Sequence, residues 1–279
     1  MRVKIIVDST ADLLPELKAQ VQVVPLTVHF GDKEYIDGVT IDHKTFYEML
    51  VESDEQPSTS QATPAAFSDV FYQVSAAGDS AVVLTLSQQL SGTYQSAMIA
   101  AEEFADIYVV DTASVAIGGG ILAELALRLA AEGLDARSIA RRIEQEKENV
   151  RIVAMLDTLE YLKRGGRISK TVALAGSLLN IKPVVSIVDG KIEMLGKARG
   201  SKQGNNLLAQ EIEKCGGVDF SKPVLLGYTG MSDVLLQKYI VDSAHLWRDG
   251  TDSLRCTCIG SVIGTHAGPG AVAVAFFKK

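Results

Sequence analysis

Hydroxyl side chains precede two predicted helices in the first third of the chain, and each could help to bind an anion. Segment 84–94, LTLSQQLSGTY, follows an apolar run and leads into apolar residues at helical spacing. Ser91 therefore stands where a helix begins, near unpaired backbone N–H groups and the positive end of the dipole. A carboxylate or phosphate could bind there, although serine at such a position also serves simply as an N-cap. Thr59 and Ser60 lie just upstream of a second such start, at Thr63 and Pro64.

A cationic segment at 163–170, KRGGRISK, is the second feature with chemical potential. It is either a solvated loop or a surface that meets phosphate or an acidic partner, because guanidinium groups suit bidentate contacts with oxyanions. Cys256 and Cys258 would share one face of a strand, as a metal-binding pair does. The histidines supply no second pair at metal-site spacing, so we interpret these cysteines as small buried residues and expect no metal and no cofactor.

Alternating strands and helices must position these residues. Strands are predicted at 3–7, 81–86 and 107–110, and 21–30 is predicted as a further strand that Pro25 confines to an edge. Helices are predicted at 45–51, from Thr63, from 94, at 120–132 and from 135 to 149. This alternation is typical of a mainly parallel α/β sheet, which binds ligands at the carboxyl ends of its strands.

The pattern changes near residue 150. A strand is predicted at 151–156, an apolar helix at 171–179, and a hairpin whose Asp189-Gly190 pair suits a type I′ turn. Helices at 205–215 and 233–247, a strand at 224–228 and two final strands around the glycine-rich loop 264–270 complete the prediction. The expected fold class is therefore two-domain α/β: residues 1–150 with a mainly parallel sheet and residues 151–279 with a mixed or antiparallel sheet.

Composition and missing motifs exclude several classes of function. A net charge of −7 disfavours a nucleic-acid or anionic-membrane surface, and residues 115–131, the longest apolar stretch, contain Glu124 and Arg128. We expect no membrane insertion, at most transient membrane contact, and a cytoplasmic location, given three cysteines and no signal-peptide pattern. The chain has no G-x-x-x-x-G-K-[ST], G-x-S-x-G or S-x-x-K motif. The GGGILA sequence at 118–123 begins beyond its strand, so we interpret it as close helix packing and not as a dinucleotide site.

Seven short motifs, taken together and in order, resemble the DegV family. They are DSTADL (8–13), STSQ (58–61), LSGTYQSA (90–97), VVDT (109–112), LKRGGRISK (162–170), LLNIKPVVSIVDGKI (178–192) and GTHAGPGAV (264–272). Each motif alone is weak, but the ordered set is specific, and the resemblance spans residues 3–278 as one unit.

The resemblance implies a protein that holds one long-chain fatty acid, such as palmitate, in a tunnel between two domains. It assigns the fatty-acid carboxylate to Thr59 and Ser91, with His266 beside them. It associates Arg167 and Arg199, together with His266, with presenting the acyl chain to, or docking on, a separate fatty acid kinase subunit. That partner would carry ATP and magnesium, in bacterial lipid transport or fatty acid metabolism. Two departures stand out: Gln88-Gln89 replaces a common Ser-Gly and could alter the tunnel mouth, and Ala267 replaces a common Thr.

Burial of the tail can supply most of the affinity for such a ligand. About 14 methylenes at ~0.8 kcal/mol each give on the order of 11 kcal/mol before ordering and association are subtracted. The head group would then set orientation, and hydroxyl groups near helix N-termini would keep the carboxylate ionised without a salt bridge. The leading hypothesis is therefore a non-catalytic carrier. The alternatives are a stand-alone acyl- or phosphoryl-transfer enzyme or hydrolase that uses Ser9, Ser91 or His266, and a structural or regulatory interaction protein.

Overall fold

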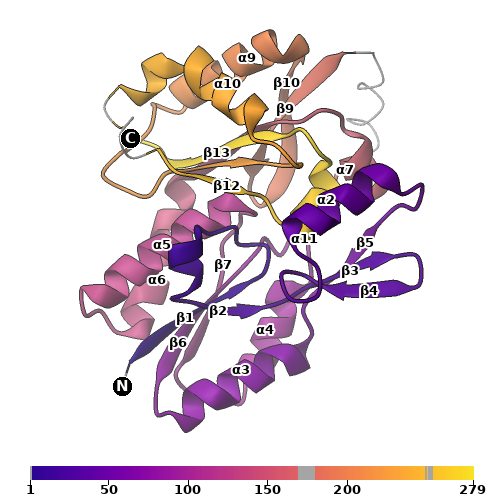
Figure 1. The fold of residues 1–279 in the computed structure, drawn as a ribbon. Helices are drawn as coiled ribbons and strands as arrows, with labels where there is room; N and C mark the ends of the chain where they lie inside the picture. Colours follow the sequence, from indigo (N-terminus) through magenta and orange to yellow (C-terminus); the bar gives the residue numbers. More distant parts are fainter. Residues whose placement is uncertain (1, 169–179, 249, 251–253) are drawn as a thin grey trace.

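Three β-sheets organise the computed structural model, which describes residues 2–168, 180–248, 250 and 254–279 (Figure 1). The strands are β1 (Val3–Asp8), β2 (Gln22–Val24), β3 (Thr27–Phe30), β4 (Lys33–Ile36), β5 (Ser58–Ser60), β6 (Ser80–Thr85), β7 (Ile107–Asp111), β8 (Val150–Met155), β9 (Ile181–Val188), β10 (Lys191–Arg199), β11 (Leu225–Tyr228), β12 (Cys256–Cys258) and β13 (Val272–Phe277). The helices are α1 (Pro15–Lys18), α2 (His43–Glu52), α3 (Pro64–Ala76), α4 (Thr93–Ala101), α5 (Ile117–Ala131), α6 (Ala136–Glu146), α7 (Glu160–Arg164), α9 (Gly200–Lys214), α10 (Val234–Asp242) and α11 (Ser261–Ala267), with 3₁₀ turns η1 (Lys147–Asn149) and η3 (Ala244–Trp247).

The first sheet has the order β2-β1-β6-β7, and all its neighbouring strands are parallel. Successive residues of β1 point to opposite faces, so Ile5 and Val7 pack with α5 and α6, while Ile6 packs with α3 and α4. Thr63 and Asp135 cap α3 and α6 as predicted, because each side chain accepts a hydrogen bond from the backbone N–H three residues later. The predicted parallel α/β sheet is confirmed.

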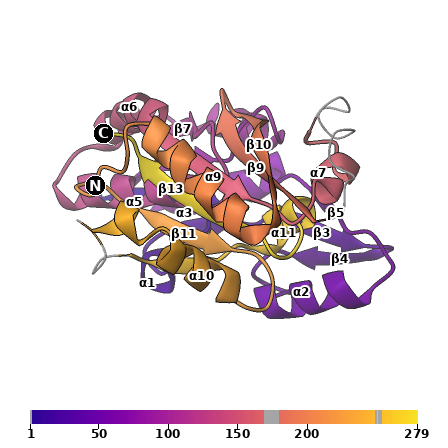
Figure 2. The same cartoon turned by 90° about the horizontal axis from the view of Figure 1, so that it is seen from above.

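The second sheet is mixed and has the order β10-β9-β8-β13-β11-β12. Its pairs are antiparallel except for β11 and β12, and α9 and α10 cover one of its faces (Figure 2). The β9–β10 hairpin turns through Asp189 (φ 49°) and Gly190 (φ 75°), as a type I′ turn requires. The mixed sheet and its hairpin are therefore as predicted.

Helix α5 joins the two larger sheets, because it contacts β1 and β6 on one side and β11 and β13 on the other. Side chains from both sheets, such as Val82 and Ala273, thus belong to one hydrophobic cluster. A Cβ on Gly120 of α5 would lie 2.1 Å from the carbonyl oxygen of Asp12, so its packing excludes any side chain there. This supports the interpretation of the 118–123 glycines as a packing feature. The domain division near residue 150 stays a prediction, although β8 begins at Val150.

The structure contradicts several of the predicted strands, helices and loops. Residues 21–30 do not form one strand, because the chain leaves β2 at Pro25 and enters β3 of a third, antiparallel sheet, β4-β3-β5, which the pattern did not predict. The segment expected as a final loop begins within helix α11, and the helix expected at 233–247 is α10 followed by η3. Cys256 and Cys258 are only partly buried, because β12 is an edge strand.

Some expectations fall outside the part of the chain that the structure describes. They are the helix at 171–179 and the last two residues of the cationic segment, Ser169 and Lys170. None of the helices in the described ranges combines the length and the hydrophobicity that a membrane-spanning segment requires.

Candidate functional site

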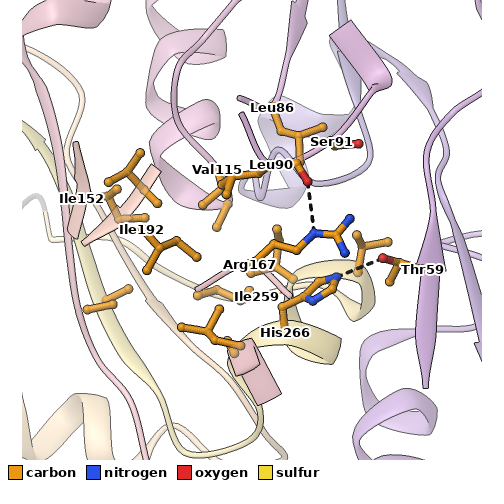
Figure 3. Close-up of a pocket in the computed structure, with 18 of the residues that line it drawn as sticks. Thr59, Leu86, Leu90, Ser91, Val115, Ile152, Arg167, Ile192, Ile259 and His266 are labelled. Atoms are coloured by element: carbon orange, nitrogen blue, oxygen red, sulfur yellow. Dashed lines mark hydrogen bonds between the residues drawn. The ribbon is translucent and has the colours of Figure 1, made fainter. Parts of the chain in front are cut away.

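A cavity of about 360 Å³ lies where the carboxyl edge of the parallel sheet meets the mixed sheet. Strands β8, β9, β10 and β13 form one wall, the loops after β6 and β7 form another, and α11 and β5 close it (Figure 3). Its volume lies within the usual range for small-molecule pockets, about 300–1,000 Å³. Most of the lining is apolar: Leu26, Leu86, Leu90, Val115, Ala116, Ile152, Ala154, Leu156, Leu162, Val185, Ile187, Ile192, Ile259, Val262, Ile263, Ala267, Ala271 and Ala273. The position at the ends of β6 and β7 agrees with the prediction from the alternating pattern.

The functional groups of four predicted site residues gather at one end of this cavity. Thr59, Ser91, Arg167 and His266 lie together, while Ile152 lies toward the opposite end (Figure 3). The hydroxyl of Thr59 and Nε2 of His266 are 3.0 Å apart and hydrogen bonded, although 207 residues separate them. The cavity is therefore amphipathic, with one polar end and a mostly apolar body, in which the hydroxyls of Ser186 and Thr229 are hydrogen bonded to the backbone.

Thr59 and Ser91 reach the cavity from different elements. Thr59 is the central residue of β5 and pairs with Val28 of β3, so the third sheet positions its hydroxyl. Ser91 precedes α4, whose N-cap is Gly92 and not Ser91. Its Oγ nevertheless accepts a hydrogen bond from the backbone N–H of Thr93 at 3.3 Å and bonds the Thr93 hydroxyl at 2.9 Å. Ser91 thus satisfies a first-turn donor and also faces the cavity.

His266 lies in the last turn of α11 and is neutral at pH 7. Burial, reinforced by the Arg167 guanidinium, lowers the pKa of its imidazole to about 4. Its Nδ1 is buried and has no hydrogen-bond partner among the described residues. A Cβ on Gly165 would lie 2.1 Å from this nitrogen, so only glycine leaves room for the ring. Gly165 was not predicted as a site residue, although it lies within the cationic segment 163–170.

Arg167 places a positive charge at the polar end of the cavity. Its Nε donates to the carbonyl of Leu90 at 3.2 Å and its Nη1 to the carbonyl of Gly165 at 2.6 Å. No carboxylate in the described ranges lies within ion-pair distance of this guanidinium. The sequence predicted that Thr59, Ser91 and His266 would face a bound carboxylate without a salt bridge, and the structure adds the cation of Arg167 beside them.

Arg199 does not join this group. It is the exposed last residue of β10, and its backbone N–H donates to Oε1 of Gln203. Gln88 and Gln89 are exposed and do not line the cavity. Gln89 lies instead against the hairpin turn, since a Cβ on Gly190 would come within 3.2 Å of its Cγ. The hairpin tip is held there, since Ser87 Oγ donates to the carbonyl of Gly190 at 2.7 Å.

Gln61 is a further polar lining residue that the STSQ motif contained without an assigned role. Its Nε2 donates to Ser96 Oγ at 2.9 Å and to the Gly92 carbonyl at 3.4 Å. A Cβ on Gly92 would lie 2.2 Å from Oε1 of Gln61. This close contact couples β5 to the start of α4, and so joins the elements that carry Thr59 and Ser91.

The groups needed by the enzyme alternative are not paired in this arrangement. Ser91 bonds Thr93 while His266 bonds Thr59, whereas a serine nucleophile needs hydrogen-bond contact with its base. Ser9 lines a different, much smaller cavity, and its Oγ accepts a hydrogen bond from the Leu26 N–H at 3.1 Å. Among the residues that the structure describes, no group of three or more His, Cys, Asp or Glu side chains could hold a metal ion.

Comparison with known proteins adds to this geometry. A family model described as an uncharacterised protein of the DegV family matches residues 2–279. A DegV domain-containing protein of Caldanaerobacter subterraneus subsp. tengcongensis is 34% identical over 284 residues, covering 100% of this chain and 99% of that protein. A solved structure from Thermus thermophilus, described as fatty acid binding of a DegV family protein, is 31% identical with a TM-score of 0.88 over 100% of both chains. Another, a stearic-acid-binding protein of Eubacterium ventriosum, is 27% identical with a TM-score of 0.85 over 100% of this chain and 99% of that one.

Proposed function

Because this chain belongs to the DegV family, we propose that its cavity binds one long-chain fatty acid, with the tail in the apolar body and the carboxylate at the polar end. The observation that carries the proposal is the distribution of polar groups. Thr59, Ser91, Arg167 and His266 converge at one end (Figure 3). The lining toward Ile152 is mostly apolar, and the hydroxyl of Ser186 there already donates to the carbonyl of Ile152 at 2.8 Å. A single-headed amphiphile matches this division, because its tail needs no hydrogen-bond partner and its head needs several.

The polar groups suit an ionised carboxylate. Arg167 supplies a positive charge, and the hydroxyls of Thr59 and Ser91 supply donors. When the Thr59 hydroxyl donates to the carboxylate, its oxygen is free to accept, so Nε2 of His266 carries the proton and donates to it. Neutral His266 thereby orients Thr59 without competing with Arg167 for the negative charge.

The biological role we propose is that of a carrier in the bacterial cytoplasm. The protein holds the acyl chain and presents its carboxylate to a separate ATP-dependent kinase subunit, which forms the acyl phosphate in fatty acid metabolism or lipid transport. Arg167 at the polar end and exposed Arg199 are the proposed residues of presentation and docking. The chemistry at the carrier is limited to binding and orientation, since its hydroxyls and imidazole hold the carboxylate and transfer no group.

Titration of delipidated protein tests the binding step. Palmitate should displace a fluorescent fatty acid, hexadecanol should do so more weakly because it lacks the charge, and short-chain butyrate should not displace it. Binding of butyrate as tightly as palmitate would contradict a site in which tail burial supplies the affinity.

A coupled assay tests the carrier role. Palmitate-loaded protein, ATP, magnesium and a bacterial fatty acid kinase subunit should yield an acyl phosphate, which hydroxylamine traps as the hydroxamate. The protein should give no hydroxamate when the kinase is omitted. Turnover of palmitoyl phosphate or an acyl ester by the protein alone would instead support the enzyme alternative.

A further inference from the structure

The buried carboxyl group of Asp8 lies at the end of β1, outside the cavity lining, and has no part in the proposed function so far. Its side chain is 1% exposed, and it forms no ion pair in the ranges that the structure describes. Three donors nevertheless converge on it. Its Oδ1 accepts from the backbone N–H of Thr10 at 2.9 Å and from the Thr10 hydroxyl at 2.6 Å, and its Oδ2 accepts from the backbone N–H of Leu86 at 2.6 Å.

This arrangement fits an ionised carboxylate and not a carboxylic acid. An ionised group only accepts hydrogen bonds, whereas a protonated one must direct its own O–H at an acceptor. Each oxygen of Asp8 already faces a donor, so a proton on either would oppose one of these hydrogen bonds. The short contact with Leu86 is typical of a charge-assisted bond.

Residues 86–91, which we call the Ser91 segment, begin at Leu86, and the hydrogen bond from its backbone N–H to Asp8 anchors the start of the segment. Leu86, Leu90 and Ser91 of this segment line the cavity, and the carbonyl of Leu90 accepts the hydrogen bond from Arg167. The segment therefore determines the position of Ser91 and of the Arg167 guanidinium together.

We propose that Asp8 is a positioning residue for the fatty-acid head group, because its ionised carboxylate fixes the Ser91 segment through the Leu86 N–H. The inference rests on the proposed function, since it assigns a role in the same site. Asp8 touches no ligand, and it acts through Ser91 and Arg167.

Burial of Asp8 makes its ionisation sensitive to pH near neutrality. Burial raises its pKa to about 6, the hydrogen bonds from Thr10 and Leu86 oppose this increase, and the negative charge of Asp37 adds to it. Asp8 in turn helps to raise the pKa of Asp12, and the positive charge of Lys18 opposes that increase. As pH falls through about 6, Asp8 becomes protonated and the Leu86 hydrogen bond weakens.

The test compares Asp8→Asn with Glu124→Gln as a matched control. Glu124 is also a buried carboxyl, but its hydrogen bonds within the described residues are to Arg128 and Arg255 and not to the Ser91 segment. At pH 7.5, Asp8→Asn should lower palmitate affinity about tenfold, the effect of losing a hydrogen bond to a charged group, and should increase deuterium uptake at 86–91. Glu124→Gln should change neither quantity.

A pH profile with hexadecanol separates positioning from general destabilisation, because this probe does not titrate between pH 5 and 8. Wild-type affinity for hexadecanol should fall as pH decreases through about 6, and Asp8→Asn should remove that step. Thr10→Val deletes a hydrogen bond that lowers the pKa of Asp8, so the step should move to higher pH while affinity at pH 8 is retained.

Unchanged affinity and uptake in Asp8→Asn, or a Thr10→Val profile identical to wild type, would overturn the assignment. Deuterium uptake at 86–91 does not require a ligand. A wild-type protein that binds no fatty acid would therefore refute the proposed function. Comparison of deuterium uptake at 86–91 between wild type and Asp8→Asn would still decide whether Asp8 fixes the Ser91 segment. If Asp8→Asn does not fold, the Thr10→Val profile decides the question, since that variant keeps the carboxylate.

Discussion

Replacing Thr59 by valine tests the head-group site most sharply, because the two side chains have the same shape and differ in one hydroxyl. Among the residues that the structure describes, this hydroxyl hydrogen bonds Nε2 of His266 alone, so its loss should lower the free energy of unfolding by about 1 kcal/mol. In the proposed complex with a fatty acid, the same hydroxyl also donates to the carboxylate. A hydrogen bond to a charged group contributes about 1.5–3 kcal/mol, so palmitate should bind roughly 10- to 150-fold more weakly.

Displacement of a fluorescent fatty acid at pH 7.5 measures this change. The affinity for hexadecanol should fall only about fivefold in Thr59→Val, because its hydrogen bond to Thr59 joins neutral groups and contributes about 1 kcal/mol. Thr40→Val is the control, since the exposed Thr40 hydroxyl accepts a backbone hydrogen bond from Ile36 far from the cavity lining. Its affinity should equal that of wild type. Thr59→Val protein that binds palmitate as tightly as wild type would refute the assignment of Thr59 to the carboxylate.

Two further predictions concern His266. Gly165→Ala places a methyl group 2.1 Å from Nδ1, so it should displace the imidazole, weaken palmitate binding and lower the free energy of unfolding by about 1–3 kcal/mol in urea titrations. Gly119→Ala, whose Cβ would meet its nearest neighbour at 3.7 Å, should change neither palmitate binding nor the free energy of unfolding. An equal loss of both in the two variants would contradict the steric argument. The pKa of His266 falls from 6.5 to about 4 on folding, so its contribution to stability is complete above pH 6.5 and is lost as pH falls toward 4. The full contribution of this pKa shift is about 3 kcal/mol. The difference in free energy of unfolding between wild type and His266→Asn should therefore shrink by that amount between pH 7 and pH 4. A difference that stays constant with pH would show that the imidazole is not buried in its neutral form.

Local signals in the sequence predicted much of the fold. Thr63 caps α3 because its side-chain oxygen accepts a hydrogen bond from the otherwise unpaired backbone N–H three residues later. This interaction is local and needs no tertiary contact. The Asp189-Gly190 turn follows in the same way from the positive φ angles that these residues tolerate. Pro25 indicated an edge strand at 21–30, but the pattern could not say that the chain changes sheets there, since that depends on the pairing of Val28 with Thr59 of β5.

The sequence named residues that share one cavity, but it did not predict how they are arranged there. Thr59, Ser91, Arg167 and His266 were chosen from a family resemblance, and the structure brings all four to one cavity. The position of Arg167 depends on the Leu90 carbonyl, which lies 77 residues away, so no local pattern could place the cation at the polar end. Helix α11 was mistaken for a loop because its glycines suggested a turn, whereas Gly264 is needed for close packing against Phe46 and Tyr47.

Native mass spectrometry of protein purified from bacterial cells, without added lipid, tests the central claim most directly. The measured mass should exceed the sequence mass by that of one fatty acid with a chain of about 14 to 18 carbons, and organic extraction should release that acid. This result follows from a cavity with an apolar body and one polar end, where tail burial provides on the order of 11 kcal/mol before losses. Protein that carries no lipid, and after delipidation takes up no long-chain fatty acid, would contradict the account.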